Sequence, residues 1–253
     1  MTIELLRLAL RVQAAGTQKE KRETITECEL DGLLKQEVFS DTLTPCLGES
    51  EDVFVSGMHF CGLMLCFVLD EFMSVDLSMK IFEYLEQISE KFVKLRGRTC
   101  LALGGTVTSE GLVVKDDVPG WLSLLMKAVP GCEFQPNHAL INVYNPGQGI
   151  MAHQDGPAYF PYAVILSLGS GGVFEFVNMD RKVCREIYVG VGSLLKFSGQ
   201  AYTSVMHQFD ARRFDTVKLT DTRRLGLSCY SNGVLSRGKR ISITMRHVKP
   251  CEQ

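Results

Sequence analysis

The sequence lacks any apolar run of the ~20 residues that a helix needs to cross a bilayer. It also lacks a Cys-x2-Cys pair: its nine cysteines are scattered along 253 residues. Scattered cysteines without a secretory signal indicate unpaired thiols in a reducing compartment. With 45% hydrophobic residues there is ample material for a large core. We therefore expect a soluble monomer of the cytoplasm, the nucleus or both, without membrane association.

The chain also lacks a strong net charge, which is −2, but its basic residues are concentrated. Residues 181–249 contain fourteen lysines and arginines against four acidic residues. Such an asymmetry can attract a polyanion to one face of a protein. The same residues could instead be spread over several strands, with two of them serving an acidic co-substrate, and composition does not decide between these readings. If a basic face exists, Arg212, Arg213, Arg223 and Arg224 are its candidate members.

The most informative stretch runs from Leu140 to Pro157. It begins as an apolar strand, breaks at Asn145-Pro146-Gly147, and resumes toward His153-Gln154-Asp155. The break is explained by turn chemistry, since proline fixes φ and glycine tolerates positive φ. In an extended segment, side chains two residues apart project from the same face. His153 and Asp155 can therefore converge on one metal ion.

A third ligand is available in His207, which lies in Ala201–His207, a segment that we expect to form a strand. Two histidines and one carboxylate form the facial triad of non-haem iron(II) oxygenases. His-x-Asp is common in solvated loops, so the pattern needs independent support. His138 and His247 are expected to be structural.

That support comes from Arg240 to Arg246, where polar and apolar residues alternate as in a half-buried strand. Arg240, Ser242, Thr244 and Arg246 share one face. Two inward guanidinium groups need anionic partners, which a dicarboxylate such as 2-oxoglutarate would supply. If this segment stood alone, a solvent-facing basic face on an edge strand would explain it better.

Together, these motifs resemble those of the AlkB family of iron(II)- and 2-oxoglutarate-dependent dioxygenases, including its Asn-x-Tyr motif at Asn142-Val143-Tyr144. The resemblance spans about residues 57–249 and implies that His153, Asp155 and His207 bind Fe(II), with O2 as the other co-substrate. It implies that Arg240, assisted by Tyr144, binds the distal carboxylate of 2-oxoglutarate. Arg246, assisted by Asn142, would orient the carboxylate beside the iron. Ser242, also in the co-substrate set, stands where nucleic-acid-repair members carry Asn.

The resemblance further implies oxidative demethylation of an N-alkylated RNA or DNA. Tyr159, Phe160 and Tyr162 follow the metal motif and could stack on a flipped or single-stranded base, although aromatic residues in such positions also complete cores. The same chemistry on a protein side chain stays open. A nucleic-acid-binding module with little turnover is a weaker alternative, and a cupin or isomerase would not need two inward arginines.

The implied fold is α+β: a double-stranded β-helix (jelly-roll) core with buttressing N-terminal helices. Residues 1–56 are expected to form a partly helical or disordered extension, and residues 57–249 the dioxygenase domain. Ser74 is a candidate N-cap before helical periodicity over Lys80–Val93, and a second helix is expected from Pro119 and Trp121. Glycine-punctuated strands are typical of a barrel or sandwich. The expected strands are Gly62–Phe72, Leu140–Tyr144, Tyr162–Gly169, Val173–Val177, Ile187–Phe197, Ala201–His207, Leu225–Tyr230 and Arg240–Val248.

Overall fold

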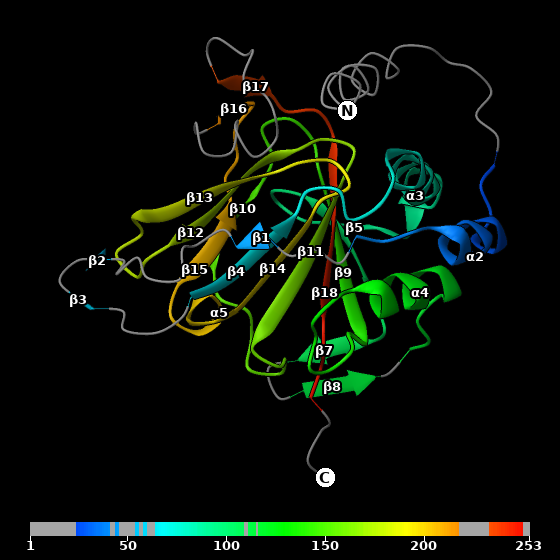
Figure 1. Cartoon of the computed structure of the whole chain (residues 1–253), viewed down its shortest axis with the longest axis horizontal. Coiled ribbons are helices and arrows are strands. Elements are labelled where there is room, and N and C mark those ends of the chain that lie inside the picture. Colours follow the sequence, from blue (N-terminus) through cyan, green and yellow to red (C-terminus); the bar gives the residue numbers. More distant parts are fainter. Residues whose placement is uncertain are drawn as a thin grey trace.

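Two antiparallel sheets face each other, and helices cover the outer face of the larger sheet (Figure 1). The computed structural model describes residues 24–40, 44–45, 54–55, 58–59, 64–108, 111–114, 116–217 and 233–249. No helix among these residues combines the length and apolar character needed to cross a membrane.

The larger sheet has eight strands, and its central strands carry the co-substrate motifs. In order across the sheet they are β1 (Thr44–Pro45), β4 (Met64–Leu69), β14 (Leu194–Gly199), β11 (Tyr162–Leu168), β18 (Arg240–Arg246), β9 (His138–Tyr144), β6 (Thr99–Leu103) and β5 (Val93–Lys94). The alternation predicted for β18 is observed. Ile241, Ile243 and Met245 pack into the core beneath the helices. The polar residues of β18 therefore face the smaller sheet, because successive side chains of a strand point to opposite faces.

The smaller sheet has four strands, in the order β10 (Ile150–His153), β15 (Met206–Phe209), β12 (Gly172–Val177) and β13 (Val183–Val189). A second apolar core fills one end of the space between the sheets. Its largest members are Phe174, Phe176, Phe197 and Tyr202, which with Ile165 and Leu195 join strands of both sheets.

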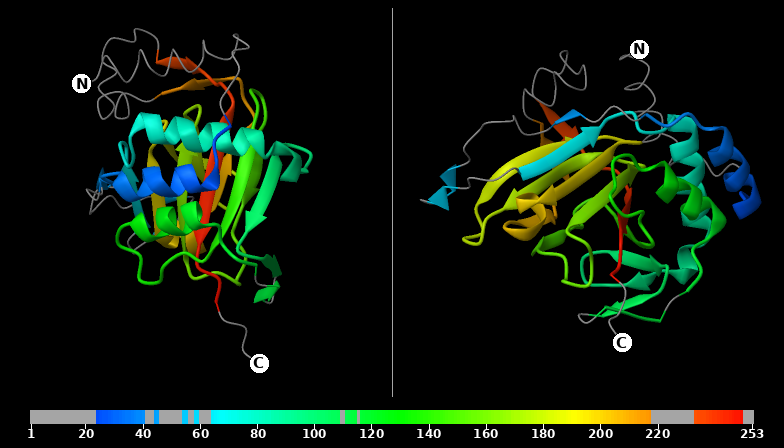
Figure 2. Two further views of the ribbon diagram at one scale, coloured as in Figure 1. Left: turned by 90° about the vertical axis from the view of Figure 1, so that its right-hand side faces the viewer. Right: turned by 60° about the horizontal axis from the view of Figure 1, so that its bottom comes forward.

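Three helices form the outer layer, seen in front of the sheet in the left view of Figure 2. They are α2 (Glu27–Gln36), α3 (Val75–Gln87) and α4 (Gly120–Ala128). The Leu77 N–H donates to Ser74 Oγ at 3.3 Å, so Ser74 is the N-cap of α3 as predicted. Trp121 at the start of α4 is only 1% exposed, which makes it a core residue as expected.

Smaller elements connect these layers. They are the hairpins β2 (Phe54–Val55)–β3 (Met58–His59), β7 (Thr106–Thr108)–β8 (Gly111–Val114) and β16 (Phe214–Thr216)–β17 (Val234–Ser236), the 3-10 turn η2 (Ser89–Lys91) and the one-turn helix α5 (Gln200–Thr203). The five described cysteines are free thiols, in agreement with the expectation of unpaired cysteines.

The predicted α+β fold with a jelly-roll core is confirmed, but several boundaries were wrong. The helix expected after Ser74, with periodicity over Lys80–Val93, begins at Val75 as its N-cap predicts but already ends at Gln87. Ile187–Phe197 is two strands rather than one, because the chain turns at Gly192, where φ is +74°. The segment Ala201–His207 is not one strand: α5 occupies its first part and β15 begins at Met206. The strand expected at Leu225–Tyr230 lies outside the described residues.

Helix α2 lies within residues 1–56, which were expected to be partly helical. Leu30 and Leu34 are buried in the same core as α3 and α4, and Glu27 accepts a 2.7 Å hydrogen bond from the Tyr84 hydroxyl of α3. Helix α2 is therefore packed onto the domain, while the boundary at residue 57 stays a prediction.

Replacing Leu30 with alanine is expected to lower the free energy of unfolding by about 3 kcal/mol, because the side chain is fully buried and leaves a cavity. Val38→Ala is the matched control, since Val38 is 90% exposed. Urea unfolding would measure both. Equal stabilities of the two variants would show that α2 is not part of the cooperatively folded unit.

Candidate metal and co-substrate site

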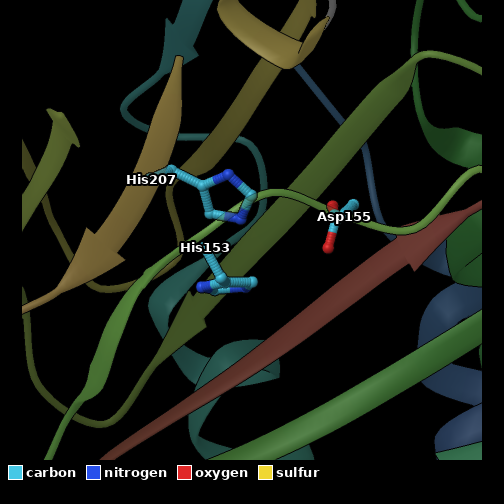
Figure 3. A group of neighbouring side chains, drawn as sticks. All are labelled: His153, Asp155 and His207. Atoms are coloured by element: carbon cyan, nitrogen blue, oxygen red, sulfur yellow. The ribbon is translucent and has the colours of Figure 1, made fainter. Parts of the chain in front are cut away.

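The three predicted metal ligands lie close together (Figure 3). His153 ends β10, Asp155 follows two residues later, and His207 lies opposite His153 on β15. One potential ligand atom from each residue lies within 4.8 Å of the other two. The rings of His153 and His207 have centroids 4.4 Å apart. The fold therefore brings the neighbouring residues His153 and Asp155 together with the distant His207 in one cluster.

Both imidazoles are prepared to act as neutral ligands. His153 Nδ1 lies 2.9 Å from the Met151 carbonyl, so in the neutral ring Nδ1–H donates and Nε2 carries the free lone pair. His207 packs against the Phe174 and Phe197 rings. Burial lowers the pKa of His207 to about 3 and also lowers the pKa of His153. Near neutral pH, both rings are therefore in their neutral form.

The carboxylate of Asp155 is held by Arg246. Arg246 Nε donates to one Asp155 oxygen at 2.8 Å and Nη2 donates to the other at 2.7 Å. Both side chains are 6% exposed. Tyr159 lies beside the pair, with the guanidinium carbon of Arg246 4.9 Å from its ring centroid. A bidentate pair of this kind fixes the plane of the carboxylate as well as its position.

The donor set fits a single divalent transition-metal ion. Two neutral imidazoles and one carboxylate are the ligands that Fe(II) takes in the facial triad. His207 Nδ1 is buried and has no hydrogen-bond partner among the described residues. An unsatisfied buried nitrogen beside a carboxylate is explained by a bound cation or by a group that the cation brings with it.

A second cationic position lies at the other end of β18. Arg240 is 3% exposed, and its Nη2 donates to Ser167 Oγ at 2.9 Å. Its Nε is buried without a hydrogen-bond partner among the described residues. Burial lowers the pKa of Arg240 to about 10, so it remains charged at neutral pH. Its guanidinium lies over the rings of Phe209 and, further away, Tyr144, which is its register partner on β9.

Arg240 is thus a buried cation without a salt-bridged acid among the described residues. Its neighbour Arg237 does have one: Nε and Nη2 donate to the two oxygens of Asp215 at 2.5 and 2.6 Å. Because Asp215 neutralises Arg237, the unpaired positive charge is left on Arg240. This position suits the distal carboxylate of 2-oxoglutarate.

Sequence reasoning missed the polar network that supports this end of the site. Arg237 stacks over Phe209 with its guanidinium carbon 4.0 Å from the ring centroid. Arg212 forms ion pairs with Glu175, which is fully buried, and with Asp210 at 3.1 Å. Residues 210–238 show no clean periodicity, so no signal in the sequence identified these partners.

Asn142, expected to assist Arg246 at the carboxylate beside the iron, does not lie opposite Arg246 in the sheet. Asn142 pairs with Ser242 across β9 and β18, whereas Arg246 lies opposite His138. The amide oxygen of Asn142 instead accepts a 2.8 Å hydrogen bond from Arg98 Nε. Arg98 was not among the candidate site residues, because nothing in the sequence links it to a position 44 residues away.

The predicted substrate residues are only partly near the site. Tyr159 lies beside Arg246, but Phe160 stacks on Phe134 with centroids 4.1 Å apart. Tyr162 is 7% exposed, belongs to the core beneath the helices, and donates to the Phe134 carbonyl at 2.6 Å. Its proposed base contact is therefore incorrect, since its side chain points away from the site.

The basic segment is dispersed in the described residues. Lys196, Arg237, Arg240 and Arg246 are buried, so they cannot contribute to an exposed face. Arg212 is held by Glu175, whereas Arg213 is exposed and lies beside Gly147. Arg223 and Arg224 lie outside the described residues.

His138, expected to be structural, is buried beside Tyr159. Burial, aided by Arg246, lowers its pKa to about 4, against a hydrogen bond to the Gly105 carbonyl. Between about pH 6.5 and 4, the unfolded chain binds a proton that the folded chain does not, so stability falls as the pH falls through this window.

We expect the metal-free protein to lose about 2 kcal/mol more unfolding free energy between pH 7 and pH 5 than a His138→Gln variant, which has no titratable group there. Chemical denaturation of both proteins at the two pH values measures this difference. Identical pH dependences would contradict the buried neutral state of His138.

Comparisons with known proteins agree with this geometry. Residues 75–246 match the model of the 2OG-Fe(II) oxygenase superfamily. The chain is 27% identical over 177 residues to a zebrafish (Danio rerio) protein named "Probable RNA/DNA demethylase ALKBH6", covering 62% of this chain and 74% of that protein. This agrees with the pattern from Asn142 to Tyr159, which resembles AlkB homologue six.

A second relative is the tRNA (carboxymethyluridine(34)-5-O)-methyltransferase ALKBH8 of Macaca fascicularis, 35% identical over 123 residues. The match covers 46% of this chain but only 18% of that protein. Among solved structures, OsALKBH1 superposes with a TM-score of 0.51 at 16% identity, over 72% of this chain and 97% of that chain, which supports the fold. The chain therefore belongs to the 2OG-Fe(II) oxygenase superfamily, which uses Fe(II), 2-oxoglutarate and O2, and its similarity to AlkB homologues agrees with the resemblance of its motifs to the AlkB family.

Proposed function

We propose that this dioxygenase oxidatively demethylates an N-alkylated nucleic acid, RNA or DNA. The oxidation is inferred from the cluster of His153, Asp155 and His207 together with Arg240, a buried cation that has no salt-bridged acid among the described residues and faces the same space between the sheets. The choice of nucleic acid is supported by the relatives, one named as a probable RNA/DNA demethylase and another as a tRNA methyltransferase.

In the proposed mechanism, His153, Asp155 and His207 hold Fe(II), and Arg240 binds the distal carboxylate of 2-oxoglutarate. When bound, the metal would supply the chemistry that couples the oxidative decarboxylation of 2-oxoglutarate by O2, to succinate and CO2, to hydroxylation of a substrate C–H bond. When that carbon is an N-methyl group, the hydroxylated product releases formaldehyde and the free amine.

The chain's own contribution is positioning. Arg246 keeps the Asp155 carboxylate in place through two hydrogen bonds, and the Met151 carbonyl sets the tautomer of His153. Phe174 and Phe197 pack against His207 and exclude water from one side of the cluster. Tyr159, near Arg246 and partly exposed, is the aromatic residue placed to contact the substrate.

The five free cysteines in the described residues support a reducing compartment, the cytoplasm or nucleus.

Each of His153→Ala, Asp155→Asn and His207→Ala is expected to abolish iron-dependent conversion of 2-oxoglutarate to succinate, because the three side chains supply all the protein ligands. Succinate release with added Fe(II) and ascorbate measures this. The matched control is Gln154→Ala, between the two neighbouring ligands, whose side chain donates to the Thr203 carbonyl instead. Full activity in any of the three variants would remove that residue from the ligand set.

The substrate is tested by binding of methylated and unmethylated single-stranded oligonucleotides over a range of salt concentrations, beside formaldehyde release. Affinity should fall steeply with salt, since phosphate contacts release counterions. Arg213→Ala should weaken all sequences alike and reduce the slope of log affinity against log salt by about one. Arg213 is exposed beside Gly147 in the turn before β10.

Lys127→Ala, on the exposed surface of α4 in the outer helix layer, is the control and should bind normally. Binding that ignores both salt and the Arg213 change would contradict the electrostatic contact. Intact 2-oxoglutarate turnover without binding or demethylation of any oligonucleotide would instead favour a protein or small-molecule substrate.

A further inference from the structure

Arg98 lies in the turn between β5 and β6. This turn contacts the start of β10, the strand that ends at His153, and also Asn142 of the predicted co-substrate set. The Leu95 N–H donates to the Arg98 carbonyl at 2.8 Å, which closes the turn. The Gly149 N–H, at the entry to the metal strand β10, donates to the Gly97 carbonyl at 3.2 Å. A side chain on Gly97 would collide with the Gly149 carbonyl, since a Cβ there would lie 2.7 Å from that oxygen. The backbone at Arg98 is therefore held in register with the metal strand.

The side chain of Arg98 fixes the orientation of the Asn142 amide. Arginine has only donors, so the amide atom that faces its Nε at 2.8 Å must be the oxygen. Asn142 is 4% exposed, and no second side-chain hydrogen bond joins it to another described residue. Because β9 lies between β6 and β18, an amide oxygen turned toward Arg98 on the β6 side leaves the amide nitrogen facing β18 and the interior.

Two other inward donors near this amide are engaged. Arg246 directs Nε and Nη2 to Asp155. Ser242, opposite Asn142, lies beside Tyr144, and a hydrogen bond from it lowers the pKa of the Tyr144 hydroxyl, against the larger effect of burial, which raises it. Arg240 lies further along β18, where the distal carboxylate is expected. The Asn142 amide nitrogen is therefore a free, oriented donor between the metal cluster and Arg240.

We propose that Arg98 is a positioning residue for the co-substrate: by holding the Asn142 amide oxygen, it aims the amide N–H2 at the carboxylate of 2-oxoglutarate next to the metal. The inference rests on the proposed co-substrate site and adds a residue to it.

The test is a double-mutant cycle on 2-oxoglutarate affinity, measured by calorimetry with the full chain loaded with Mn(II). Asn142→Ala should raise the Kd about tenfold through loss of a hydrogen bond to a charged group, and Arg98→Ala by a similar factor. The double variant should be no weaker than Asn142→Ala alone, because Arg98 acts through Asn142. Arg98→Lys should restore the affinity only in part, since a lysine lacks the planar Nε–H.

Arg96→Ala, an exposed arginine in the same turn, is the matched control and should leave the Kd unchanged. The affinity for Mn(II) alone should be unchanged in Arg98→Ala, whereas damage to the turn and β10 would lower it. A wild-type Kd in Arg98→Ala, or effects that multiply to about a hundredfold in the double variant, would overturn the inference alone. Failure of the wild-type protein to bind 2-oxoglutarate would overturn the co-substrate site and the inference together.

Discussion

The paired hydrogen bonds between Arg246 and Asp155 are the interaction on which the site depends. They join the central strand β18 of the larger sheet to the segment that follows β10 in the smaller sheet. Both groups are nearly buried, so removing either one would leave the charge of the other buried without a partner, which is strongly destabilising. A metal at the cluster would share the Asp155 carboxylate with Arg246, and the ligand geometry and the sheet packing are therefore linked.

The space between the sheets is divided between two kinds of packing. Phe174, Phe176 and Phe197 fill one end with rigid aromatic contacts, while the polar faces of β9 and β18 line the other. The buried charges at the polar end are tolerated because most have an acid partner, as Arg237 has in Asp215. Of the two described arginines of β18, Arg246 has an acid partner and Arg240 has none. A buried cation that lacks a partner indicates a ligand site.

Residue chemistry and the family resemblance were sufficient to find the metal cluster, since His-x-Asp and a distant histidine require few residue types. The alternation over Arg240–Arg246 also placed both guanidinium groups on the inner face. The partners of the charged side chains were not predictable. Arg98 and Asn142 are 44 residues apart, and Arg212 and Glu175 are 37 residues apart, so these pairs exist only after the sheets assemble. Tyr162 was misplaced because proximity in sequence to the metal motif does not determine which face of β11 it occupies.

The hairpin of β16 and β17 carries one further consequence. Its strands are joined at the far end by a hydrogen bond from the Val217 N–H to the Gly233 carbonyl at 2.6 Å, and at the near end by Arg237 and Asp215. Val217 and Gly233, the two ends of the connection, thus lie next to each other. Loop-closure entropy grows only slowly with length, by about 0.6 kcal/mol for each doubling. Because the hairpin itself holds Val217 and Gly233 together, a change in the length of the connection between them would have little effect on the position of Arg240.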